Sequence, residues 1–184
     1  VLPRDVEPLP NAEAAIAAMM ATVQQHYFRE LGRTFQLRTP LVSVVRHEQT
    51  ASALTAAMAL NRGRVTADLI ANRFRADFEY RENVIMFVVE GVSLPAATGG
   101  ANVVVIPANY WRSIHQHFMR SPHDLHSAGL LHGWSHELGH AFGLSHTEDG
   151  TRPCFARFGV AMGPFPSLIM QKTTDRPSLF DYPF

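Results

Sequence analysis

Two histidines and a glutamate in the second half of the chain have the types and spacing needed to activate water on a metal ion. His136 and His140 are four residues apart, so on a helix they lie one turn above each other and both imidazoles can reach one ion. Glu137 precedes His140 by three residues, so its carboxylate flanks that ion without having to bind it. This is the place of a general base for an attacking water.

A third histidine can complete the set of metal ligands. Gly143 can adopt the left-handed conformation that ends a helix and reverses the chain, which returns His146 towards His136 and His140. Three neutral nitrogen ligands leave the fourth tetrahedral position open, as in a catalytic rather than a structural zinc site. The pattern predicts hydrolysis of a peptide bond by a metal-activated water, with Glu137 as general base.

The segment 136–146 resembles the metzincin clan of zinc metallopeptidases, whose extended motif is HExxHxxGxxH followed by a methionine-bearing turn. Residues 167–170 look like that turn, with Met170 as a soft apolar floor beneath the imidazoles. Thr147 follows the third histidine and fits none of the best-known subfamilies, so the chain is not assigned to one. The resemblance implies a Zn²⁺ cofactor and a polypeptide substrate that pairs, extended, with a sheet-edge strand.

The resemblance also implies the fold class, which is α+β of the metzincin-like zincin type. We expect one catalytic domain over residues 1–184. Its upper lobe, residues 1–143, would hold a twisted mixed sheet with long backing and active-site helices, and residues 144–184 would form a small irregular lower lobe. A chain of 184 residues is the size of one such domain.

Composition bounds the partners of the protein. The chain has 16 Lys and Arg residues against 16 Asp and Glu residues, so it has no excess charge with which to attract nucleic acid or an anionic membrane. Its longest apolar stretch, residues 84–89, is far shorter than the roughly 20 residues that span a bilayer. We therefore expect a monomer that binds neither. The single Cys154 does not decide the compartment, but an initial Val1 hints at processing, and we expect secretion.

Periodic patterns predict the elements that position the motif. Residues 1–10 should form an extended arm, followed by a helix that Asn11 caps and Gly32 ends, with an apolar stripe at Ile16, Met20, Val23 and Tyr27. Residues 35–46 form a strand-like run that Pro40 interrupts, and residues 84–89 and 102–106 read as buried strands on either side of a loop at 93–100.

Further helices are expected at residues 52–61 and 66–78, the second with Ile70 and Phe74 in packing roles. Asn109 is expected to cap a short helix that Pro122 ends. The motif itself should lie on a longer helix over residues 127–142.

Several alternatives stay open at this stage. The cleft could capture a partner without cutting it, as a zinc-stabilised binding module or latent effector. Asp5 or Glu7 on the arm could reach the zinc and block it. His132, one turn before His136, could belong to a second metal site, and Tyr110 or Tyr182 could serve as an extra ligand.

Overall fold

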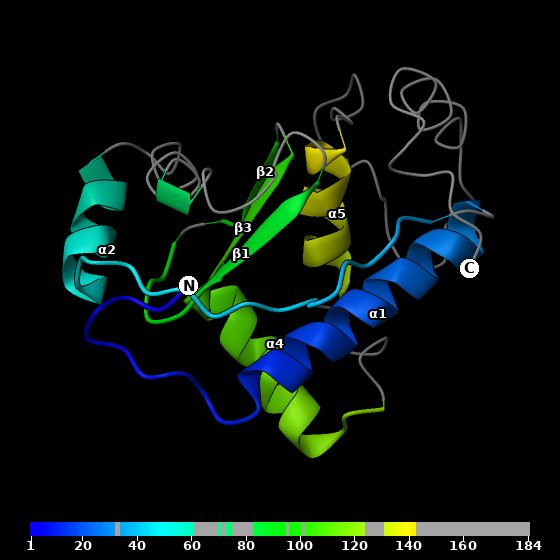
Figure 1. Ribbon diagram of the computed structural model, residues 1–184, viewed down its shortest axis with the longest axis horizontal. Coiled ribbons are helices and arrows are strands. Elements are labelled where there is room, and N and C mark those ends of the chain that lie inside the picture. Colours follow the sequence, from blue (N-terminus) through cyan, green and yellow to red (C-terminus); the bar gives the residue numbers. More distant parts are fainter. Residues whose placement is uncertain are drawn as a thin grey trace.

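A computed structural model describes residues 1–31, 34–60, 70, 73–74, 83–94, 96–100, 102–123 and 131–142. The labelled elements of this part of the chain are α1 (Ala12–Leu31), α2 (Ala51–Leu60), β1 (Ile85–Val89), β2 (Thr98–Gly100), β3 (Val103–Pro107), α4 (Ala108–Arg120) and α5 (Leu131–Ala141). Figure 1 shows the three strands at the centre, with α2 and α5 on opposite sides of them. Helices thus pack around a mixed sheet, which agrees with the expected mixture of α and β structure.

The sheet has the order β1-β3-β2. β1 is parallel to β3, with Phe87 opposite Val105, whereas β2 is antiparallel to β3, with Gly99 opposite Val104. Every residue of β3 is buried, because this central strand is covered on both faces. The two apolar runs at residues 84–89 and 102–106 are therefore buried strands, as their β-branched composition predicts.

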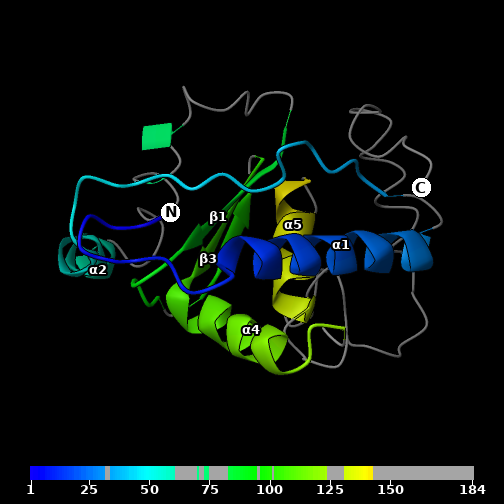
Figure 2. The same cartoon turned by 60° about the horizontal axis from the view of Figure 1, so that its bottom comes forward.

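Three helices cover one face of the sheet. Figure 2 shows α1 crossing near α4, with α5 beside both. The predicted apolar stripe of α1 packs into the core on this face. Trp111 of α4 contacts Trp134 of α5, with ring centroids 6.4 Å apart. Val88, Val104 and Ile106 point into the same core from the strands. This core fixes α5, the helix that carries the predicted metal ligands, against the sheet.

A second core lies on the opposite face. Alternate residues of β1 and β3, including Phe87 and Val105, pack there against Leu54 of α2. Ile70 and Phe74 are buried in the same cluster, which confirms their predicted packing role. Helix α2 occupies the expected position, and the remainder of the helix expected over residues 66–78 lies outside the described residues.

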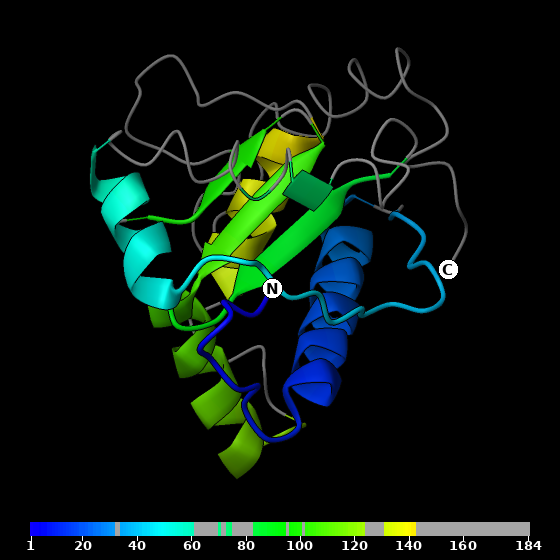
Figure 3. The same ribbon diagram turned by 60° about the vertical axis from the view of Figure 1, so that its left-hand side comes forward.

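The N-terminal arm extends the sheet beyond β1. The Leu2 amide donates to the Val45 carbonyl at 2.9 Å, and the His47 amide donates to the Leu2 carbonyl at 2.8 Å. On its other side, the Glu90 amide donates to the Val1 carbonyl at 3.0 Å. The arm therefore lies between residues 45–47 and the end of β1, as Figure 3 shows where the N-terminus meets the strands. The expectation of an extended arm is correct.

The strand-like run at residues 35–46 joins the sheet only at its end. Apart from the isolated bridge between Leu2 and Arg46, residues 35–46 form no strand. Pro40 has no amide hydrogen to donate to a ladder, and Val44 is 52% exposed instead of packing inward. The expected strand over this run is therefore wrong for most of its length.

Two predicted caps differ in the structure. Asn11 precedes α1 but has a φ of 56°, and its side-chain amide is 3.9 Å from Met119 Sδ rather than on the first turn of the helix. Helix α4 begins at Ala108 without a side-chain cap, because the Asn109 amide group bonds both the amide and the carbonyl of Leu94. Asn109 thus anchors the preceding loop instead of starting the helix. Within the described residues, no helix is long and apolar enough to cross a membrane.

Candidate metal centre and active site

Helix α5 brings two of the predicted ligands together. The Nε2 atoms of His136 and His140 are 3.1 Å apart, and their rings are 4.5 Å apart between centroids at an interplanar angle of 82°. This follows from a four-residue spacing on a helix, which stacks side chains one turn apart. Two nitrogen lone pairs can therefore converge on one point.

The pair fits a zinc ion. Zinc–nitrogen bonds of about 2.0–2.1 Å in a tetrahedral arrangement place two ligand nitrogens roughly 3.3 Å apart. The 3.1 Å between the Nε2 atoms of His136 and His140 is close to this separation. The His136 side chain is 15% exposed, so the donor set is partly shielded from water but still reachable. Neutral imidazole nitrogens are ligands that zinc commonly takes.

Glu137 lies beside this pair without joining it. Its Oε1 atom is 4.0 Å from His136 Nε2, which is beyond a hydrogen bond, and its side chain is 13% exposed. Burial raises the pKa of Glu137 to about 7, although a hydrogen bond from the Gly99 backbone amide opposes this rise. A carboxylate whose pKa lies near neutrality can both take and release a proton at ordinary pH.

The sheet and helix α5 are joined directly beside the candidate site. The Asn102 amide, just before β3, donates to the Ala141 carbonyl at the end of α5 over 3.3 Å. Trp134 and Leu138 of α5 are buried in the core on this face of the sheet. The helix therefore has a fixed position relative to the strands, which sets where the histidines and Glu137 face.

Sequence reasoning missed the part played by β2. Residues 93–100 were expected to form a loop, yet Thr98–Gly100 is a strand that packs against α5. Its central residue, Gly99, hydrogen-bonds the Glu137 carboxylate through its backbone amide. The available signal was a glycine in an extended segment, which often marks close approach of another backbone.

Most of the other residues predicted for the metal site fall outside the part of the chain that the structure describes. His146 and Met170, like Tyr182, are outside the described residues, and the same holds for the side chain of His132. Among the described residues there is no group of three or more potential ligands that could hold a metal. Tyr110 is partly buried and packs against the core of α1, α4 and α5, as an aromatic packing role requires.

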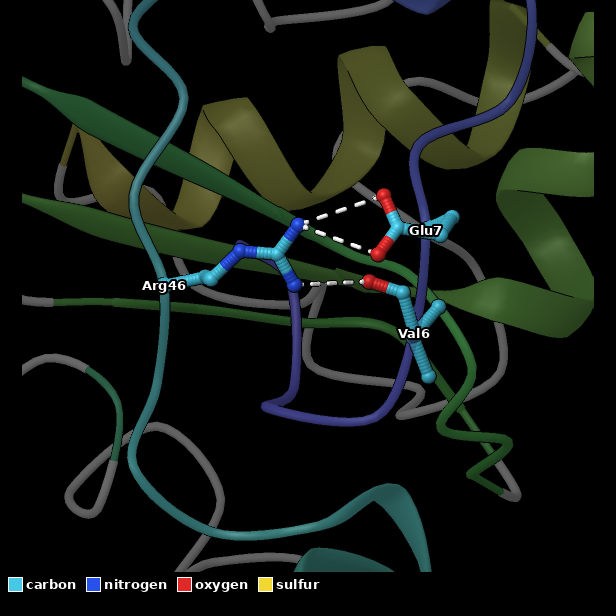
Figure 4. Close-up of polar contacts among 3 residues, drawn as sticks. All are labelled: Val6, Glu7 and Arg46. Carbon is cyan, nitrogen blue, oxygen red and sulfur yellow. Dashed lines mark hydrogen bonds and ion pairs between the residues drawn. The ribbon is translucent and has the colours of Figure 1, made fainter.

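The two acids of the arm have other partners. Asp5 Oδ1 accepts a hydrogen bond of 2.8 Å from the Ala51 amide at the first residue of α2. Figure 4 shows the contacts of Glu7, whose carboxylate faces the Arg46 guanidinium with a closest approach of 3.3 Å. Arg46 also donates a hydrogen bond to the Val6 carbonyl. These contacts belong to the arm and to α2, so in this structure neither acid serves as a blocking ligand.

A cavity of about 600 Å³ lies between α1, β1 and the segment 35–45. Leu138 of α5 and Phe142, directly after that helix, line it, together with apolar side chains of α1 and β1 such as Ile16 and Met86. His136, Glu137 and His140 are not among its lining residues. The candidate metal centre is therefore distinct from this cavity.

Comparison with known protein families identifies the chain as a metallopeptidase. The model of metallo-peptidase family M12 matches residues 5–178, which is most of the chain. The protein belongs to metallo-peptidase family M12 and is a metzincin-type metallopeptidase, as the motif over residues 136–146 predicts. Membership implies a hydrolase whose substrates are polypeptides. Searches of curated proteins and of solved structures gave no match.

Proposed function

We propose that this chain is a zinc-dependent endopeptidase in which His136, His140 and His146 hold Zn²⁺ and Glu137 is the general base. One observation carries the proposal, namely the 3.1 Å approach of the His136 and His140 Nε2 atoms beside the partly buried Glu137 carboxylate. Membership of family M12 supports it from outside the structure.

Each residue has a distinct part in the proposed reaction. Zinc, when bound, polarises the attacking water and the scissile carbonyl as a Lewis acid. Glu137 accepts a proton from that water on its carboxylate and then delivers it to the nitrogen of the leaving amine. Partial burial of the Glu137 side chain favours the neutral carboxyl group, which helps it to hold that proton between the two transfers. His136 and His140 orient the metal relative to Glu137, because all three share one helix.

The proposal extends to the whole domain. Residues 1–143 would form the upper lobe and residues 144–184 the lower lobe of one catalytic domain, with Met170 beneath the imidazoles. The substrate would bind as an extended polypeptide along an edge of the sheet, since unpaired backbone groups there can accept a further strand. We propose that the protein acts as a monomer outside the cell, where uncontrolled proteolysis is tolerable.

The test measures zinc content and peptide cleavage on the same preparations. The wild-type chain should bind about one zinc per molecule and cleave an unstructured polypeptide, and a chelator should abolish cleavage. Glu137→Gln should keep the metal but lower kcat by about 10²- to 10⁴-fold. His140→Ala should lose both metal and activity. Glu13→Gln, which alters an exposed acid at the start of α1, is the matched control.

Two results would contradict the proposal. A Glu137→Gln variant that cleaves at the wild-type rate would remove the general base. A wild-type chain that binds zinc and captures peptides from a library without cleaving any would favour the zinc-stabilised binding module instead.

A further inference from the structure

The backbones of β2 and α5 come very close together at Gly99 and Glu137. A Cβ atom added to Gly99 would lie 2.7 Å from the carbonyl carbon of Glu137 and 3.0 Å from its Cα. Cβ atoms do not approach backbone this closely, so only glycine fits between the strand and the helix. The neighbouring Gly100 differs, because a Cβ added there meets nothing within 4 Å. The requirement for glycine is therefore specific to position 99.

The same glycine also contacts the side chain of the residue that it packs against. The Gly99 amide donates a hydrogen bond to the Glu137 carboxylate. Close packing of Gly99 on the α5 backbone brings this amide within reach, since any larger residue would move the strand away from the helix. Gly99 thus touches both the main chain and the reactive group of Glu137.

A glutamate side chain needs such support to act as a base. Its three rotatable bonds allow the carboxylate many conformations. The rate of a reaction falls steeply when a reacting group leaves the productive geometry. The carboxylate lies 4.0 Å from His136 Nε2, and a backbone donor on a strand can hold it there because the strand is itself paired with β3.

We propose that Gly99 is a positioning residue for peptide hydrolysis, whose contact with α5 and amide hydrogen bond hold the Glu137 carboxylate beside the metal ligands. The proposal rests on the proposed role of Glu137 as general base. It adds a residue of the sheet to a site that the motif alone places entirely on one helix and the turn after it.

The decisive variant removes the amide hydrogen without adding volume. Replacing Gly99 with glycolic acid by semisynthesis converts its amide to an ester, which deletes the donor, adds no volume and weakens the Thr98 carbonyl as an acceptor. We expect kcat to fall at least tenfold, with KM within about twofold of wild type and zinc content unchanged. A glycolic acid variant with wild-type kcat would overturn the proposal.

A methyl group at the same position tests the packing half of the proposal. Gly99→Ala should lower kcat by about 10²-fold, whereas Gly100→Ala, which adds the same methyl to the same strand in open space, should keep wild-type zinc content and unfolding temperature. Gly133→Ala on α5 should keep wild-type kcat, since a Cβ there also meets nothing within 4 Å. A Gly99→Ala protein that folds and retains full kcat would contradict the close contact.

A double substitution separates positioning from a general structural effect. In the Glu137→Ala background, the glycolic acid change should cause no further loss of residual activity, because the group that it positions is gone. A further loss of the same size would assign Gly99 a purely structural role. If Glu137→Ala itself retains activity, the proposed function fails, and if only the Gly99 variants retain activity, the positioning role fails alone.

Discussion

The phenol of Tyr27 in α1 donates a hydrogen bond of 2.9 Å to the carbonyl oxygen of Ser135, the residue that directly precedes His136 in α5. The Tyr27 ring is buried and also meets Phe35 and Phe142 edge-on, with centroids 5.5 and 6.0 Å away. Helix α1, the longest described helix, therefore makes a hydrogen bond to the backbone beside the predicted metal ligands and an aromatic contact with Phe142, directly after α5.

Removing that hydroxyl should destabilise the fold modestly. Tyr27→Phe should lower the free energy of unfolding by about 1 kcal/mol, because one buried hydrogen bond is lost while the ring contacts remain. Tyr27→Ala, which also removes the ring, should cost about 3–5 kcal/mol. Urea unfolding of both variants and the wild type measures the difference. Equal losses for the two variants would show that the ring contributes nothing.

The arm stabilises α2 from a distance in sequence. Asp5→Ala should lower the free energy of unfolding by about 1 kcal/mol, since its carboxylate accepts the bond from the Ala51 amide where the helix dipole favours an anion. Asp5→Asn, which keeps the acceptor, should cost less. Glu7→Gln is the matched control and should cost less than about 1 kcal/mol, because Glu7 is 84% exposed.

The same variants test the idea that the arm blocks the metal. Peptidase activity of Asp5→Asn and Glu7→Gln should equal that of the wild type, since both acids contact the arm, α2 or Arg46. An increase in activity on removing either carboxylate would instead make that acid an inhibitory ligand.

Acid should destabilise the protein partly through His47. This side chain is 4% exposed, and its Nδ1 atom accepts a hydrogen bond of 3.0 Å from the Gln49 amide. Burial lowers the pKa of His47 below its ordinary value of 6.5. Well above pH 6.5 the group is neutral in both states and has no effect, but as the pH falls through 6.5 the unfolded chain gains a proton that the folded chain resists.

The test compares His47→Asn with the wild type, because the asparagine oxygen can replace Nδ1 as acceptor. From pH 7.5 to 5.5 at constant zinc, the free energy of unfolding should fall more for the wild type than for the variant. All other ionisable groups are the same in the two proteins, so the difference isolates His47. Identical pH profiles would show that its pKa is unshifted in the folded state.

Replacing a glycine in the first turn of α5 should stabilise the protein. Gly133→Ala should raise the free energy of unfolding by about 0.5–1 kcal/mol, since alanine is the better helix former and a Cβ there meets nothing within 4 Å. This corresponds to roughly 1–4 °C in melting temperature for a chain of this size. Thermal melts with and without zinc measure the change, and a lower melting temperature would mean that the position is crowded.

The sequence predicts well those elements whose physics is local. The stripe of α1 and the β-branched residues of β1 and β3 carry their own periodicity, and the four-residue spacing of His136 and His140 fixes their approach. Strand β2 was missed because two of its three residues are glycines, which signal turns when read alone. The contact between Gly99 and Glu137 could not be foreseen, since it arises only when strand and helix pack together.

The strand-like run at residues 35–46 shows the opposite error. Its apolar residues match a strand, yet Pro40 and the competing arm decide which backbone joins the sheet. Pairing partners in a sheet are chosen among segments distant in sequence, and a pattern within one segment carries no information about that choice.

The central strand β3 divides the interior into one core beneath α2 and another beneath α5. Substitutions around Leu54 can therefore change the thermal stability of the protein without changing the geometry of the candidate site. In such an architecture, thermal stability and catalytic rate can change independently of each other during evolution.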